Sequence, residues 1–194
     1  MTVFGRAKGM FGSLRGLYGL GMRCRAVSGG IVGEVERLVM ILGQSLRSQG
    51  LRMATAESCT AGLVASTLTD VAGSSDWFEG GVVAYANQVK ARLLSVPEDV
   101  FVRHGAVSQA CVESMVRGVC QLMDAPVGLA ISGIAGPGGG TLLKPVGTVW
   151  VAWEYCGRVW SRVFLFKGSR RDIKKQSAWA AIEELARGYK NGAS

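Results

Sequence analysis

Apolar residues recur along the chain in two patterns, one typical of amphipathic helices and one typical of buried strands. Helical spacing predicts five helices, at residues 31–48, 59–71, 87–94, 109–123 and 174–189, and residues 97–102 are expected to form a short turn or helix. Short apolar runs predict five strands, at residues 52–56, 81–85, 127–131, 146–155 and 159–166. The last two runs are joined at Cys156-Gly157-Arg158, which indicates a β-hairpin, and Ser108 is the expected N-cap of the helix that follows it.

This order of elements mixes crossover units with a terminal hairpin. It predicts an α/β fold, a three-layer α/β/α sandwich around one mixed sheet. A length of 194 residues suits one domain, and an apolar content of 48% is typical of a globular protein that could also bury a subunit interface. The chain has no window of eighteen apolar residues, so we expect no transmembrane helix.

The net charge of +8 is concentrated at the N-terminus. Residues 1–30 hold five basic residues, no acidic residue and eight glycines. We interpret them as a disordered or misannotated extension, with a transit peptide as the alternative, and place the domain at residues 31–190. Because the rest of the chain is only mildly basic, we expect no nucleic-acid partner.

The segment Thr55-Ala56-Glu57-Ser58-Cys59-Thr60-Ala61-Gly62 joins a predicted strand to a predicted helix. Such a turn can aim a hydroxyl and backbone N–H groups at one point, where an anion or a developing oxyanion would bind. The alternative is structural, with Ser58 or Thr60 accepting hydrogen bonds from the first amides of the helix as its N-cap. The local pattern leaves both interpretations open.

Further motifs follow in order along the chain. They are Gly80-Gly81-Val82-Val83-Ala84-Tyr85-Ala86-Asn87-Gln88-Val89-Lys90, then Gly105-Ala106-Val107-Ser108, then Ser132-Gly133-Ile134-Ala135-Gly136-Pro137-Gly138-Gly139-Gly140-Thr141, and last Lys144-Pro145-Val146-Gly147-Thr148-Val149. With Glu57-Ser58-Cys59-Thr60, they resemble the C-terminal domain of the competence/damage-inducible protein CinA over residues 34–190. Several motifs in order are far more specific than one. Free-standing members of that family are nicotinamide-mononucleotide amidohydrolases.

Hydrolysis of an amide needs a nucleophile, a base and a site for the oxyanion. His104 is the single histidine and lies outside the motifs, so we expect neither a Ser-His-Asp triad nor a metal site built from imidazoles. A lysine with a lowered pKa is then the remaining base for a serine. The resemblance implies that Ser58 is the nucleophile and that Tyr85 and Lys90 stand beside it at the active site. The hydroxyl of Tyr85 could relay a proton, or its ring could stack on nicotinamide. From spacing alone, Lys90 would be a solvated helix residue.

The expected substrate-binding residues lie in the same motifs. Backbone amides of residues 59–62 are candidates for the oxyanion site, and the glycine-rich loop at 133–140 could approach a phosphate or be a plain turn. Asn87 is also a plausible helix cap. The expected ligands of the substrate are Thr60, Ala61, Gly62, Asn87, Gly133, Gly136, Lys144, Thr148 and Arg170.

Two residues depart from the pattern of the family. Ser169 stands where an aspartate is usual before Arg170, and Ala61 replaces the first glycine of Thr-Gly-Gly. If that glycine needs a positive φ, alanine would be strained. Cys59 beside Ser58 is expected to be a small buried thiol, and it is the next nucleophile to consider if Ser58 is not the catalytic one. The five cysteines lack C-x-x-C spacing and indicate reduced thiols in a cytoplasmic protein.

The resemblance therefore implies hydrolysis of nicotinamide mononucleotide to nicotinic acid mononucleotide and ammonia by a serine–lysine pair. We expect no metal or organic cofactor, no membrane association, a small pyridine nucleotide as the ligand and a homodimer. One alternative is an amidohydrolase for a related pyridine or purine nucleotide. The other is a non-catalytic nucleotide-binding or regulatory module linked to competence or DNA damage.

Overall fold

A computed structural model describes residues 31–191, so the prediction for residues 1–30 lies outside the described residues. The strands are β1 (Met53–Glu57), β2 (Phe78–Val83), β3 (Val127–Gly133), β4 (Thr148–Tyr155) and β5 (Arg158–Leu165). The helices are α1 (Ile31–Ser48), α2 (Leu63–Thr69), α3 (Asn87–Leu94), α4 (Glu98–Arg103), α5 (Gln109–Leu122) and α6 (Arg170–Asn191), with a short 3-10 turn, η2, at Ser74–Asp76. The predicted order of the other helices and strands is confirmed, and the segment expected as a short turn or helix at 97–102 forms the helix α4.

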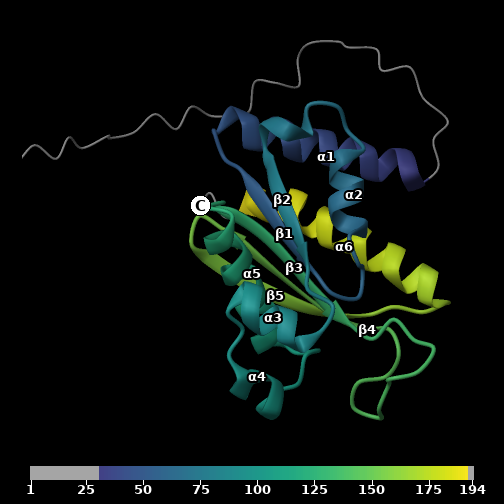
Figure 1. Cartoon of the computed structure of the whole chain (residues 1–194). Helices are drawn as coiled ribbons and strands as arrows, with labels where there is room; N and C mark the ends of the chain where they lie inside the picture. Colours follow the sequence, from purple (N-terminus) through teal and green to yellow (C-terminus); the bar gives the residue numbers. More distant parts are fainter. Residues whose placement is uncertain (1–30, 192–194) are drawn as a thin grey trace, which may run out of the picture.

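The strands form one mixed sheet in the order β2-β1-β3-β4-β5 (Figure 1). The central strand β1 is parallel to both β2 and β3, whereas β4 and β5 form the predicted antiparallel hairpin beside β3. Because the carboxyl ends of parallel strands meet at one edge of the sheet, the segments that follow β1, β2 and β3 converge there. Within residues 31–191, no helix has the length and apolar character that crossing a bilayer would require.

Helices cover both faces of the sheet, which confirms the predicted three-layer sandwich (Figure 1). On the side of α1, α2 and α6, the strands present large side chains such as Leu129, Ile131 and Trp153. On the side of α3 and α5, the same strands present alanines, namely Ala54, Ala56, Ala130 and Ala152. The small side chains let α5 lie close to the sheet.

Close packing continues from α5 to α3. A Cβ atom on Gly118 of α5 would lie 2.0 Å from the carbonyl oxygen of Leu94, the last residue of α3. On the sheet side, a Cβ on Gly128 would lie 2.3 Å from Sγ of Cys120. These two glycines therefore fix how near α3 and the sheet come to α5, and α3 carries Lys90.

Several boundaries differ from the prediction. The helix expected from residue 59 begins at Leu63, because Ala61 and Gly62 adopt left-handed conformations that a helix cannot include. The strand expected at 81–85 is β2 at 78–83, and α6 starts four residues before the predicted 174. Ser108 is confirmed as the N-cap of α5, since its side chain accepts a hydrogen bond from the amide of Cys111.

We predict that Gly118→Ala lowers the free energy of unfolding by about 1–3 kcal/mol, because the added methyl group meets a backbone carbonyl that cannot rotate away. Chemical denaturation measures the change. Gly33→Ala is the matched control, since Gly33 lies in α1 with no atom within 4 Å of its added Cβ, and alanine is the better helix former. Equal stability of the two variants would contradict the close contact between α5 and α3.

Candidate active site

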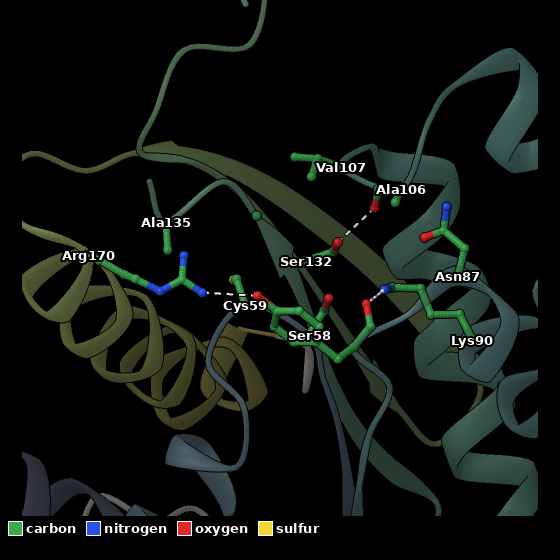
Figure 2. Close-up of a pocket in the computed structure, with 11 residues that line it drawn as sticks. Ser58, Cys59, Asn87, Lys90, Ala106, Val107, Ser132, Ala135 and Arg170 are labelled. Carbon is green, nitrogen blue, oxygen red and sulfur yellow. Dashed lines mark hydrogen bonds between the residues drawn. The ribbon is translucent and has the colours of Figure 1, made fainter. Parts of the chain in front are cut away.

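A pocket of about 190 Å³ opens at the carboxyl ends of β1, β2 and β3. Its walls come from the turn after β1, the start of α3, the segment before α5, the end of β3 and the start of α6 (Figure 2). The lining residues are Ser58, Cys59, Tyr85, Asn87, Lys90, Ala106, Val107, Ser132, Gly133, Ala135 and Arg170. The sheet therefore gathers motifs that are far apart in the sequence.

Ser58 follows the last residue of β1 directly and has 8% of its surface exposed. Its backbone amide donates to the carbonyl of Ile131 in β3 at 3.0 Å, which continues the parallel pairing by one residue. The serine is thus held by the sheet while its side chain lines the pocket. The end of a central strand is a suitable place for a nucleophile, because the sheet fixes its position.

The N-terminus of α2 is capped by Glu57, a residue that the sequence reading did not select. One carboxylate oxygen accepts hydrogen bonds from the amides of Gly62 and Val64 at 2.9 and 3.1 Å, and the other accepts from Ala65 at 2.8 Å. Neither Ser58 nor Thr60 caps this helix: no side-chain cap bond comes from the N-cap position, and the buried hydroxyl of Thr60 has no hydrogen-bond partner among the described residues. The N-cap interpretation of these two hydroxyls is wrong.

The hydrogen bonds of this turn narrow the expected oxyanion site. The amide of Gly62 is bonded to Glu57, and that of Ala61 to the carbonyl of Ser58 at 3.2 Å. Of the amides of residues 58–65, those of Cys59 and Thr60 have no bond to another described residue. Two of the four amides expected for an oxyanion are therefore already occupied, and two are left.

Lys90 is buried, with 1% of its surface exposed, although it was open to interpretation as a solvated helix lysine. It extends from α3 toward the pocket, and its Nζ donates to the carbonyl of Tyr85 at 2.9 Å (Figure 2). Burial is the largest effect on Lys90 and lowers its pKa, and the thiols of Cys111 and Cys59 act in the opposite direction. A lysine in this setting can lose its proton more easily than one in water.

Cys59 also lines the pocket, but its chemistry differs from that of a reactive cysteine. Burial raises the pKa of its thiol to about 12, and the charge of Glu57 adds to the increase. The thiol is therefore protonated near neutral pH and a poor nucleophile. The prediction that Cys59 is a small buried thiol beside the turn is confirmed.

Arg170, the first residue of α6, ties three parts of the pocket together. Its guanidinium donates to the carbonyl of Gly136 at 2.6 Å. It also donates to the hydroxyl of Tyr85 at 3.0 Å, the bond drawn from Arg170 in Figure 2. Gly136 lies in the glycine-rich loop and has a φ of +80°, a conformation in which a side chain would be strained. The guanidinium has five N–H donors, so these two bonds leave others for a ligand.

Ser169 occupies the N-cap position before α6. Its hydroxyl donates to the carboxylate of Asp172 at 2.6 Å and accepts from the amide of Asp172 at 3.3 Å, and its own amide donates to the same carboxylate. This is a capping box with aspartate at the third position. The hydroxyl of Ser169 lowers the pKa of Asp172. The departure from the usual aspartate therefore keeps α6, and with it Arg170, in place.

The remaining predicted ligands lie in different surroundings. Asn87 lines the pocket, but it is the first residue of α3 and not its cap, because Ala86 occupies the N-cap position. The ammonium group of Lys144 donates to the carbonyls of His104 and Val107, both at 2.8 Å, and the hydroxyl of Thr148 bonds to the carbonyl of Pro145. Neither Lys144 nor Thr148 lines the pocket. Lys144 instead fixes the segment 104–107, which includes Val107 of the pocket wall, through these two hydrogen bonds.

The sequence reading also missed Ser132. This serine lies near the end of β3 within a quoted motif, and its hydroxyl donates to the carbonyl of Ala106 at 2.7 Å (Figure 2). Its position could have been inferred, since it directly follows the apolar run 127–131 that predicts a buried strand before the glycine-rich loop. Ala106 and Val107 left no such signal, because their contribution to the wall depends on tertiary packing.

A family profile described as the CinA C-terminal domain matches residues 35–188. The chain belongs to this family. Among relatives of the CinA C-terminal domain, the nicotinamide-nucleotide amidohydrolase PncC of Pseudomonas putida is 47% identical over 78% of this chain and 94% of its own length. The protein of the same name from Escherichia coli is 43% identical over 78% of this chain and 93% of its own length.

A CinA-like protein of Desulfotalea psychrophila is 43% identical over 84% of this chain, which spans only 41% of that longer protein. Among solved structures, a CinA superfamily protein from Escherichia coli has a TM-score of 0.77 at 34% identity over 83% of this chain and 94% of its own. The competence/damage inducible protein CihA from Agrobacterium tumefaciens has the same TM-score and identity over 84% and 98%. The predicted family and fold class are confirmed.

We predict that Ala61→Gly raises the free energy of unfolding by about 1 kcal/mol, because Ala61 has a φ of +53° and pays the penalty of a Cβ in the left-handed region. Chemical denaturation measures the difference. The same substitution four residues later, Ala65→Gly, is the control, since Ala65 lies in the helix α2 and should lose roughly 1 kcal/mol. A loss of stability in both variants would contradict the strain at Ala61.

Proposed function

We propose that this chain is an amidohydrolase that converts nicotinamide mononucleotide to nicotinic acid mononucleotide and ammonia. The observation that carries the proposal is a serine and a fully buried lysine in one pocket, Ser58 and Lys90. The relatives that match over nearly their whole length support the substrate, because they are named nicotinamide-nucleotide amidohydrolases. A pocket that holds a nucleophile and a base has parts that a pure binding module would not need.

In the proposed first step, neutral Lys90 accepts the hydroxyl proton of Ser58 while the serine oxygen attacks the carboxamide carbon. The carbonyl oxygen becomes an oxyanion, and we assign its binding to the amides of Cys59 and Thr60, which bond to no other described residue. Collapse of this intermediate breaks the C–N bond. Ammonia leaves with the proton from Lys90, and an ester to Ser58 is left.

In the second step, water attacks the ester carbon while Lys90 again accepts a proton. The same amides stabilise the new oxyanion. The ester C–O bond then breaks, and Lys90 returns the proton to the oxygen of Ser58. Nicotinic acid mononucleotide is released, and the enzyme is restored. The balance needs one water molecule and no redox partner.

Arg170 is the proposed ligand of the phosphate, because it lines the pocket and has N–H donors left beyond its bonds to Gly136 and Tyr85. Tyr85 has 59% of its surface exposed, so its ring can lie against the pyridine. Asn87 and Gly133 line the same pocket and complete the proposed contacts. Lys144 and Thr148 do not line the pocket, so in this arrangement they act through the segments to which they are hydrogen-bonded. The turn formed by Thr60, Ala61 and Gly62 contributes through its backbone.

We also propose that the protein acts as a homodimer in the cytoplasm. The apolar content of 48% and exposed apolar side chains such as Leu142 and Leu143 support a buried interface. Free thiols at Cys59, Cys111 and Cys120 fit a reducing compartment. Light scattering at micromolar concentration tests the assembly.

The direct test is release of ammonia and nicotinic acid mononucleotide from nicotinamide mononucleotide by the purified chain. We expect turnover with the mononucleotide and little with free nicotinamide, which lacks the phosphate. Binding of the nucleotide without any release of ammonia would instead favour the regulatory module.

We predict that Ser58→Ala and Lys90→Ala each reduce kcat by a factor on the order of 10³ or more, and that the double variant is scarcely worse than Ser58→Ala alone. Residues that act as one unit show such non-additivity. Cys59→Ala is the matched control next to Ser58, and we expect its kcat to stay within a few-fold of the original because the thiol is protonated. A Lys90→Ala variant with a raised KM and unchanged kcat would assign Lys90 to binding.

We predict that kcat/KM rises with pH through a pKa below 10.5, the ordinary value for lysine, because burial favours the neutral form of Lys90 and only that form accepts a proton. The rate is therefore lost on the acidic side. Lys90→Arg should abolish turnover, since a guanidinium stays charged at every accessible pH. A pH profile of the ammonia assay reads out both, and a near-normal rate for Lys90→Arg would refute the base.

A further inference from the structure

We propose that Glu57 is a positioning residue for the reaction, which fixes the turn that presents Ser58 and the amides of Cys59 and Thr60 to the substrate. The inference rests on the proposed function. Glu57 does not line the pocket, so it has no direct contact with a bound substrate. Its effect passes through the backbone of the turn.

The backbone of Glu57 belongs to the most constrained part of the sheet. Its carbonyl accepts from the amide of Ala84 at 2.8 Å, and the next amide, that of Ser58, donates to Ile131 at 3.0 Å. Strands on both sides therefore hold the entry to the turn. Nothing in this pairing, however, fixes where the turn ends.

The side chain of Glu57 fixes the other end. Its carboxylate is 1% exposed and accepts from the amides of Gly62, Val64 and Ala65 at distances of 2.8–3.1 Å. Hydrogen bonds to an ionised acceptor are stronger than neutral ones, and three of them on one buried group make the geometry rigid. One residue thus clamps the turn at its beginning through the backbone and at its end through the side chain.

The conformation of the turn needs such a clamp. Ala61 and Gly62 both have positive φ, at +53° and +92°, and the alanine is strained there. The hydroxyls of the turn offer no substitute, since that of Thr60 bonds to no described residue and Ser58 lines the pocket. Without the carboxylate, the first amides of α2 would need another acceptor, and the turn would shift. A displacement of about 1 Å at a catalytic group can cost a hundredfold in rate.

The carboxylate has a second consequence for the site. It occupies the amino end of α2, so this end cannot attract the phosphate of the substrate away from Arg170. Its negative charge also acts on the neighbouring thiol in the direction that keeps Cys59 protonated. Ser58 and Cys59 both line the pocket, and because the thiol of Cys59 stays protonated, the hydroxyl of Ser58 is the proposed nucleophile of this turn.

The test uses Glu57→Gln and Glu57→Ala in the full chain. Glutamine keeps the length of the side chain and one accepting oxygen. Its NH₂ group replaces the other oxygen and cannot accept from the backbone amide that it faces. We expect kcat for nicotinamide mononucleotide to fall roughly tenfold for Glu57→Gln and roughly a hundredfold for Glu57→Ala, with KM within about threefold of the original. The amide–carboxylate bonds are not contacts with substrate, so binding should persist.

A second measurement separates this proposal from the proposed function. A small fluorophosphonate without a nucleotide part reacts when the oxygen of Ser58 displaces fluoride at phosphorus, and this reaction needs the same turn. Its second-order rate should fall in parallel with kcat in the Glu57 variants. If the original chain reacts with the probe but does not release ammonia, the substrate assignment is wrong, and the probe rates still decide the role of Glu57.

Trp153→Phe is the control for a merely structural effect. It removes the buried hydrogen bond from Trp153 to the carbonyl of Ala181, on the face of the sheet covered by α6, and should lower the melting temperature without changing kcat or the probe rate. All variants are assayed well below their melting temperatures. Glu57→Gln with a lowered melting temperature but original kcat and probe rate would overturn the proposal. A rise in KM alone would overturn it too, and Glu57→Gln decides the matter if Glu57→Ala does not fold.

Discussion

Parallel pairing of β1 with both of its neighbours is the constraint on which the site depends. Three strands end at the same edge, so Ser58, Tyr85 and Ser132 arrive together although about 25 to 75 residues separate them in sequence. Ser58 and Tyr85 lie just beyond the ends of β1 and β2, and Ser132 is the last residue but one of β3, so the sheet holds all three near strand ends. Loops could not place these groups as reproducibly, because a loop is held by fewer hydrogen bonds.

Two ionisable side chains are buried within this edge, and the fold treats them in opposite ways. Glu57 receives three amide donors, which compensate an ionised carboxylate for the loss of water. Lys90 receives one backbone carbonyl, which is too little to compensate an ammonium group fully. Three donors therefore hold the carboxylate in one position, whereas burial lowers the pKa of the lysine and makes its proton easier to lose. The contrast follows from the partners that the sequence supplies around each residue.

Sequence reading predicted the fold well, because the apolar runs and the hairpin turn are local signals that tertiary packing did not overrule. It failed where a partner came from a distant or unexpected place. The cap of α2 comes from the strand before the turn, while local rules favour a hydroxyl at the turn itself. The sequence therefore offered Ser58 and Thr60 as the alternative caps and gave no sign of Glu57. The surroundings of Lys144 depend on a loop that returns to residues 104–107, and spacing along the chain cannot show this.

The two departures from the family pattern, Ala61 and Ser169, lie outside the residues that line the pocket. Ser169 replaces an aspartate, yet a hydroxyl serves equally well at an N-cap, and Asp172 supplies the carboxylate from one turn later. Ala61 replaces a glycine in a left-handed position, where no side-chain chemistry can remove the strain. Asp172, in the same helix, compensates for the first change. The hydrogen bonds of Glu57 to the start of α2 hold the turn in place despite the second. Their cost therefore falls on stability, while the groups that line the pocket keep their places.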